Sequence, residues 1–238
     1  MRKPQLFLLH FAGGNSYSFQ FLNQLLKDFD VIPLELPGRG KRTNEQLLRN
    51  FDLAASDIYR QIINRLTTSQ YLVYGHSMGA FLALRVSSML ETRGKSPTYV
   101  IVSGNPGPGI EDNDPPKKRY LLEKNDFISE LKTLGGVPNE LFDHEDLFRF
   151  YEPILRADFE ISENSEMSNE PPIKAPLYAL MGNQEHKVEE ISNWARFTKS
   201  SFKYQILEGG HFFILDHPQK IAEIIKSCFF LEINYRFK

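Results

Sequence analysis

Two hydrophobic patterns alternate along the chain: short unbroken apolar runs, and longer segments in which apolar residues return every three or four positions. The first pattern is typical of buried strands and the second of helices. We expect strands at residues 6–9, 31–36, 71–74, 99–103, 177–181 and 204–207. This alternation predicts an α/β fold with a mostly parallel sheet flanked by helices, and the active site of such a sheet lies beyond the carboxyl ends of its strands.

The helical periods predict where the covering helices begin and end. Helices are expected at residues 15–29, 52–66, 77–93, 188–198 and 221–229. Asp52 is the expected N-cap of the second helix, Gly94 should end the third, and Pro218 should lie in the first turn of the last. Residues 231–238 alternate weakly, which predicts a short edge strand or a loose end.

The alternation stops over about residues 105–175, where no strand pattern is found. Residues 125–134 predict a helix ended by two glycines, and residues 143–159 predict a second helix that Pro153 should kink. A helical insertion at the catalytic edge is placed as a lid over the pocket, although packing that only protects the core would give the same pattern. No linker or repeat divides the rest, so we expect one domain over residues 1–238.

Residues 75–79, Gly-His-Ser-Met-Gly, match the G-x-S-x-G pattern between an expected strand and an expected helix. A serine at this place occupies a sharp turn that lifts its hydroxyl above the sheet, and the flanking glycines allow close backbone approach. The following helix directs its N-terminal amides toward negative charge that develops beside the serine. Ser77 is therefore the expected nucleophile.

A serine nucleophile needs a histidine base, and His211 has the expected position. It follows the last expected strand in a glycine-opened loop and comes after the serine in the chain, as in hydrolases ordered serine, acid, histidine. His10 is the main rival. It precedes Ser77, however, and leads into the glycine-containing loop that an oxyanion hole requires.

The acid that orients the histidine is expected after the fifth strand. Glu185 is the first carboxylate there, and glutamate can serve in place of aspartate in this arrangement. Glu189 and Glu190 fit better at the start of the next helix, where the helix dipole favours carboxylates. Asp158 and Asp216 are more distant alternatives.

An oxyanion hole needs two backbone N–H groups. One should come from Met78, the residue after the nucleophile. The other should come from the loop after the first strand, where Ala12 is the first choice and Phe11 the alternative. Gly13 and Gly14 in the same loop would also fit a plain tight turn.

Composition argues against several other classes of protein. The formal net charge is −2, so no overall field recruits nucleic acid or an anionic membrane. No stretch approaches the roughly 20 apolar residues of a membrane-spanning helix, and the first apolar run is too short for a signal peptide. The lone Cys228 is typical of a reducing compartment, so we expect a cytoplasmic protein. No H-E-x-x-H spacing is present, and neither a metal nor another cofactor is expected.

Together these residues resemble the type II thioesterases that accompany non-ribosomal peptide and polyketide synthases, within the α/β-hydrolase superfamily. The likeness spans nearly the whole chain. It rests on HFAGGNSYSF at the start, ELPGRGKR at residues 35–42, YGHSMGA around Ser77, LGGVP at residues 134–138, ILRADFE in the insertion and EGGHFFI near the end. The resemblance implies an α/β-hydrolase fold with a helical lid.

The resemblance also implies roles for individual residues. Members of this family use a Ser–Asp–His triad, whose serine and histidine match Ser77 and His211. The usual aspartate position falls on Glu185 here, a departure that bears on rate more than on chemistry. The family's oxyanion amides correspond to Ala12 and Met78.

The implied substrate is an acyl group stalled on the phosphopantetheine thiol of a carrier domain, so the expected partners are acyl-loaded carrier domains, met in trans by a monomer. ILRADFE, with Asp158, resembles a structural feature of the lid region. Two basic clusters could meet an acidic carrier or its phosphate, although ordinary solvated surface is the plainer interpretation: Arg39, Lys41 and Arg42, and Lys117, Lys118 and Arg119. A small-molecule carboxylesterase or lipase with the same triad, and a non-catalytic binding protein of the same fold, are the alternatives.

Overall fold

The computed structural model describes residues 2–110 and 118–236, and its centre is a six-stranded parallel sheet. The strands lie in the order β2-β1-β3-β4-β5-β6. They are β1 (Gln5–Leu9), β2 (Asp30–Leu34), β3 (Tyr71–His76), β4 (Tyr99–Ser103), β5 (Leu177–Gly182) and β6 (Phe202–Leu207). The expected strands and the parallel sheet are confirmed, with strand ends that shift by at most two residues.

The strand order places a topological switch point between β1 and β3. The chain leaves β1 toward β2 on one side and later builds β3 to β6 on the other side. Leu9 at the end of β1 pairs with Gly75 near the end of β3, so the loops after these two strands begin next to each other. Open parallel sheets bind their ligands at such a point, outside the carboxyl ends of the strands.

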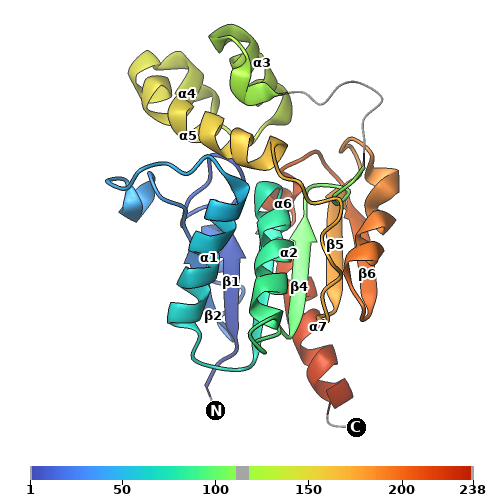
Figure 1. Ribbon diagram of the computed structural model, residues 1–238. Coiled ribbons are helices and arrows are strands. Elements are labelled where there is room, and N and C mark those ends of the chain that lie inside the picture. Colours follow the sequence, from blue (N-terminus) through green and yellow to red (C-terminus); the bar gives the residue numbers. More distant parts are fainter. Residues whose placement is uncertain (1, 111–117, 237–238) are drawn as a thin grey trace.

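Helices cover both faces of the sheet (Figure 1). The covering elements are α1 (Phe51–Arg65), α2 (Met78–Glu91), the 3-10 helix η4 (Val188–Phe197), α6 (Phe213–Asp216) and α7 (Pro218–Arg236). Successive strand residues point to opposite faces. Phe7 and Val73 therefore pack with α1 and α2, whereas Leu8 and Leu72 pack with α7 on the other face.

Two expected helix ends are wrong in detail. The N-cap of α1 is Asn50, whose side-chain oxygen accepts the Leu53 amide at 3.0 Å, whereas Asp52 lies in the first turn and pairs with Arg85. The last helix continues to Arg236, so residues 231–236 form neither an edge strand nor a loose end, and 237–238 lie outside the described residues.

The helix expected at residues 15–29 is wrong. The segment consists of successive turns with one short 3-10 helix, η1 (Gln20–Leu22). Local side-chain bonds form its first turn: the Tyr17 amide donates to Asn15 Oδ1 and the Asn15 amide to Ser18 Oγ, each at 2.8 Å. Such bonds stabilise turns at the expense of helix. The helix-like period reflects burial instead, because the large apolar residues of the segment pack against the sheet face that α7 covers.

The insertion between β4 and β5 is helical and lies above the carboxyl ends of the strands (Figure 1). Its elements are η3 (Arg119–Leu121), α3 (Lys124–Leu134), α4 (Asn139–Asp143) and α5 (Glu145–Glu163). Both expected helices are present, α5 contains Pro153, and α4 is an additional short helix. Within the described ranges, no helix is both long and apolar enough to span a bilayer.

Candidate active site

Ser77 occupies the turn between β3 and α2 in a backbone conformation that side-chain-bearing residues rarely adopt. Its φ is 57° and its ψ is −118°, a combination whose strain is on the order of 1–3 kcal/mol. Close packing requires the flanking glycines. A Cβ on Gly75 would lie 1.9 Å from the Gly79 carbonyl oxygen, and a Cβ on Gly79 would lie 2.3 Å from the Leu9 carbonyl oxygen. The G-x-S-x-G segment thus forms the sharp turn that its sequence predicts.

Hydrogen bonds with the last residue of β4 and with the loop after it hold this turn in place. The Ser77 amide donates to the Ser103 carbonyl at 2.7 Å, and Asn105 Nδ2 donates to the Ser77 carbonyl at 3.0 Å. The Asn105 carbonyl in turn accepts Trp194 Nε1 at 2.9 Å. Sequence reasoning missed Asn105, whose signal was a turn-forming Gly-Asn-Pro-Gly segment directly after a strand.

Side chains from the loops after β3, β5 and β6 form a continuous hydrogen-bonded chain. His211 Nε2 lies 3.0 Å from Ser77 Oγ, and His211 Nδ1 lies 2.7 Å from Glu185 Oε1. Glu185 Oε2 accepts the Gly182 amide at 2.8 Å, and the side chain is only 5% exposed. The structure therefore brings together the three residues that the sequence singled out as nucleophile, base and acid.

The loops that carry Glu185 and His211 are fastened to each other. The Gln184 amide donates to the Gly209 carbonyl at 3.0 Å. The contact is so close that a Cβ on Gly182 would lie 2.4 Å from the same oxygen. The glycines of both loops thus fix the distance between the two side chains.

The rival candidates lie elsewhere. Glu189 and Glu190 are exposed in the first turn of η4, and Asp216 is exposed at the end of α6. Asp158 and His10 are buried in contacts of their own. Among the described residues, no hydrogen bond links the His211 ring to any of the four rival carboxylates, which belong to Asp158, Glu189, Glu190 and Asp216.

His76, inside the elbow, lies beside His211 but makes a different hydrogen bond. The two ring centroids are 5.2 Å apart, while His76 Nδ1 lies 2.8 Å from Ser103 Oγ. Burial, and to a lesser extent the proximity of His211, holds the pKa of His76 well below its usual value. His76 is therefore neutral at pH 7 and places no competing charge beside His211.

The loop after β1 offers the amides expected of an oxyanion hole. Its Gly13 amide is occupied, because it donates to Asp158 Oδ2 at 2.8 Å. The amides of Phe11, Ala12 and Met78, in contrast, donate no hydrogen bond to any of the described residues. Among the described residues, no acceptor therefore competes for either of the expected amides or for the alternative one.

A buried ion pair ties this loop to the insertion. Arg39 Nη2 donates to Asp158 Oδ1 at 2.7 Å, and the two side chains are only 3% and 0% exposed. Arg39 Nη1 donates to the second oxygen of the same carboxylate and to the Gly14 carbonyl. Asp158 thus anchors α5 to the loop after β1, and the PGRG and RAD segments are the sequence signals of this anchor.

The Asp158→Ala substitution is expected to lower the free energy of unfolding by about 3–5 kcal/mol, because it leaves the Arg39 guanidinium buried without a counter-charge. Urea denaturation followed by circular dichroism measures this loss. Glu160→Ala, two residues along α5, is the matched control: its ion pair with Arg49 is partly exposed, and such pairs contribute about 0–1 kcal/mol. Equal losses in the two variants would contradict the anchoring role.

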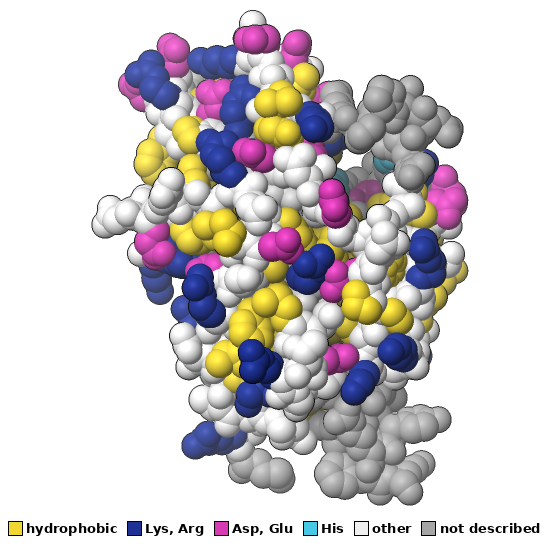
Figure 2. Space-filling model, viewed as in Figure 1, with side chains coloured by type: hydrophobic (Ala, Val, Ile, Leu, Met, Phe, Trp, Pro, Cys, Tyr) yellow, Lys and Arg dark blue, Asp and Glu magenta, His cyan; other side chains and the backbone are white. Residues whose placement is uncertain are grey.

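The arginines of the two basic clusters are engaged in contacts within the protein. Arg39 is buried, and Arg42 and Arg119 each pair with two carboxylates, which leaves exposed lysines in the described part of the two clusters. Lys117 lies outside the described residues. On the face shown in Figure 2, basic and acidic side chains are interspersed rather than separated.

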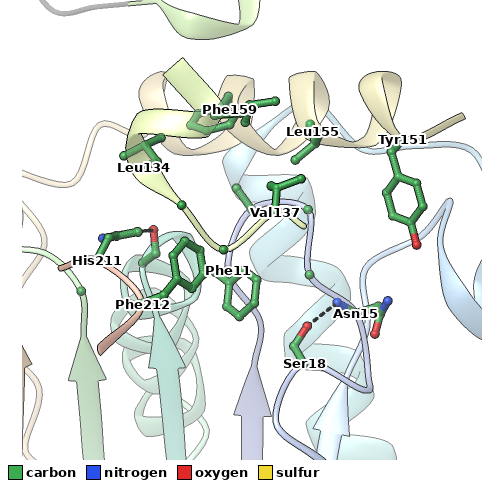
Figure 3. Close-up of a pocket in the computed structure, with 18 of the residues that line it drawn as sticks. Phe11, Asn15, Ser18, Leu134, Val137, Tyr151, Leu155, Phe159, His211 and Phe212 are labelled. Atoms are coloured by element: carbon green, nitrogen blue, oxygen red, sulfur yellow. Dashed lines mark hydrogen bonds between the residues drawn. The ribbon is translucent and has the colours of Figure 1, made fainter. Parts of the chain in front are cut away.

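A cavity of about 860 Å³ lies between these loops and the insertion (Figure 3). Ser77 and His211 line it, together with Phe11 and Phe212 from the neighbouring loops. The insertion contributes mainly apolar side chains, including Leu131, Leu134, Tyr151, Leu155 and Phe159. The reactive hydroxyl therefore faces an apolar chamber that fits an acyl group better than a highly charged one.

A family model for the thioesterase domain matches residues 4–229. The match covers nearly the whole chain, and the chain belongs to this thioesterase family. It is a hydrolase with the α/β-hydrolase fold.

Individual relatives are similar to this chain over most of their own length. Linear gramicidin dehydrogenase LgrE of Brevibacillus parabrevis is 30% identical over 93% of this chain and 86% of its own length. Thioesterase PikA5 of Streptomyces venezuelae is 27% identical over 92% and 78%. The solved structure of BorB, the type II thioesterase from the borrelidin biosynthetic cluster, is 29% identical, has a TM-score of 0.86, and matches over 95% of this chain and 93% of that one. The resemblance to type II thioesterases is confirmed.

Proposed function

We propose that this thioesterase hydrolyses stalled or aberrant acyl groups from the phosphopantetheine thiol of carrier domains. Ser77 acts as the nucleophile, His211 as general base and acid, and Glu185 as the carboxylate that orients the histidine. One observation carries the proposal: in a chain of the thioesterase family, a continuous Glu185–His211–Ser77 hydrogen-bonded chain opens into an apolar cavity.

In the first half-reaction, Ser77 Oγ attacks the thioester carbonyl while His211 Nε2 accepts its proton. Glu185 holds the Nδ1 proton of His211 and stabilises the imidazolium that forms. The amides of Ala12 and Met78 donate to the oxyanion. Collapse of the tetrahedral intermediate transfers the proton from His211 to the leaving thiolate, which frees the carrier and leaves the acyl group on Ser77.

In the second half-reaction, His211 removes a proton from water, which attacks the acyl-enzyme carbonyl. The same two amides stabilise the second oxyanion. The proton then returns through His211 to Ser77 Oγ, and the free acid leaves. The side chains of the insertion hold the acyl group during both steps, because they line the chamber next to the hydroxyl.

The relatives support carrier-bound thioesters as the substrate class. BorB is a type II thioesterase of a biosynthetic cluster, and YbtT, 26% identical with a TM-score of 0.86, is a type II thioesterase of the yersiniabactin NRPS/PKS pathway. We expect this enzyme to meet its carriers in trans, as a monomer in the cytoplasm. None of the reaction steps above requires a cofactor.

Intact-mass spectrometry of an acetyl-loaded carrier domain tests the proposal. Wild type should remove the acetyl mass and leave the phosphopantetheine arm, whereas wild type pretreated with a fluorophosphonate should leave the acetyl group in place. The same preparations are assayed on p-nitrophenyl acetate. Rapid turnover of the free ester with an untouched carrier would favour a small-molecule esterase, and no turnover of either would favour a non-catalytic protein of this fold.

A further inference from the structure

His10 follows β1 directly and is almost completely buried, with 3% of its surface exposed. It takes no part in the Ser77–His211–Glu185 chain, yet it lies two residues before Ala12. The hydrogen bonds of the His10 ring define which of its two nitrogens carries the proton.

The two neighbours of the His10 ring fix its tautomer. Leu36 N–H can only donate, and it donates to His10 Nε2 at 3.4 Å, so Nε2 carries no proton. The Phe11 carbonyl can only accept, and it lies 2.8 Å from Nδ1. The proton of the neutral ring is therefore on Nδ1, which donates to the Phe11 carbonyl.

That carbonyl belongs to the peptide unit whose N–H is the Ala12 amide. It also accepts the Gly14 amide at 2.9 Å, so two donors hold it. In a planar trans peptide the carbonyl and the following N–H point in opposite directions, and no cis peptide is found among the described residues. Fixing the direction of the Phe11 carbonyl therefore fixes the direction of the Ala12 N–H.

The environment keeps His10 in the form that this arrangement needs. Burial, reinforced by the positive charge of Arg39, lowers the pKa of His10 to about 4. A protonated ring would turn an Nε2–H toward the Leu36 N–H and break that contact. At neutral pH the ring is uncharged, and Nδ1–H is its one ring donor.

We propose that His10 is a positioning residue that orients the Ala12 amide toward the oxyanion by donating from Nδ1 to the Phe11 carbonyl. The inference rests on the proposed function, because it assumes that Ala12 contributes to the oxyanion hole. It assigns to His10 a role in transition-state stabilisation that requires no contact with the substrate.

Two amide substitutions separate this role from simple packing. His10→Asn places an NH2 group at the position of Nδ1, where it can donate to the Phe11 carbonyl, and should keep kcat on acetyl-carrier within about threefold of wild type. His10→Gln places its amide near Nε2 and loses that donor. It should lower kcat by about 10–100-fold with little change in KM, less than the loss of a whole oxyanion donor. His144→Gln, at an exposed histidine, is the surface control.

A second readout reports on the oxyanion hole itself. The inhibition constant of a trifluoromethyl ketone, which forms a hemiketal oxyanion on serine, should rise in His10→Gln by the same factor as kcat falls. A protein that is merely less stable would have fewer active molecules but an unchanged inhibition constant. Equal losses in Asn and Gln variants, or wild-type behaviour of both, would overturn the inference.

A measurement on the unmodified protein covers the case in which the variants do not fold. NMR of protein with ¹⁵N-labelled histidine near pH 7 should show His10 as the neutral tautomer protonated on Nδ1, and a proton on Nε2 would overturn the inference.

Failure of the proposed function can be told apart from failure of this inference. A Ser77→Ala variant that still deacylated the carrier would contradict the proposed function itself. A dead Ser77→Ala beside a fully active His10→Gln would remove only the role of His10.

Discussion

Replacing Ser77 with alanine is expected to lower kcat on acyl-carrier substrates by roughly 10⁶-fold, the scale of loss seen when a serine hydrolase loses its nucleophile. The variant has no atom that can form the acyl-enzyme. The amides of the oxyanion hole and the apolar chamber still bind the substrate, so KM should change little. Intact-mass spectrometry of the loaded carrier over long incubations measures the residual rate.

The fold should tolerate this substitution. Serine and alanine both carry a Cβ, so the strained φ of 57° at this position is the same in both, and the hydroxyl contributes only its bond to His211. Urea denaturation should therefore give a free energy of unfolding close to that of wild type. A fluorophosphonate probe should label wild type and not the variant. Residual activity above about 1% of wild type would contradict the role of Ser77 as nucleophile.

Glu185→Gln is expected to lower kcat by about 10⁴-fold, as the corresponding acid-to-amide change does in serine proteases. The carboxylate now accepts from both His211 Nδ1 and the Gly182 amide. A glutamine has one oxygen for these two donors, and its NH2 group must face the other. If the NH2 faces Nδ1, the histidine proton moves to Nε2 and the ring cannot accept the proton of Ser77.

Two further variants make this test specific. Glu189→Gln changes an exposed carboxylate four residues along the chain and should leave kcat near that of wild type. Glu185→Asp keeps a carboxylate on a side chain one methylene shorter and should retain far more activity than the amide. Single-turnover measurement with an acyl-carrier gives the rate of acylation directly. Equal activity of Glu185→Gln and wild type would assign the acid to another residue.

Much of the candidate site was predictable because its signals are local. A glycine-flanked serine between strand and helix patterns indicates an elbow, and a histidine in a glycine-opened loop after the last strand indicates a base. The prediction that Glu185 is the acid required only the position of the preceding strand. Each of these predictions depends on a few neighbouring residues and on the parallel sheet, which the alternation of hydrophobic patterns identifies.

The features that were not predictable depend on contacts between distant segments. Arg39 looked like a surface charge, and its partner Asp158 lies 119 residues away. His10 was considered only as a rival base, because its hydrogen bond to Leu36 cannot be read from the sequence. The helix expected at residues 15–29 failed for a related reason: periodic burial against a sheet resembles the period of a helix, while the backbone forms turns.

The insertion and the strand loops contribute different parts of the site, and this separation affects how the enzyme can change. The roof of the acyl chamber comes from one uninterrupted stretch of chain, whereas the reactive groups come from loops at four strand ends. Replacements within that stretch can change which acyl groups fit while the reactive groups keep their geometry. Asp158 is the constraint on this freedom, since any exchanged stretch must still supply a carboxylate for Arg39. Substrate preference can thus change through one segment of the chain, provided that the replacement keeps this single side chain.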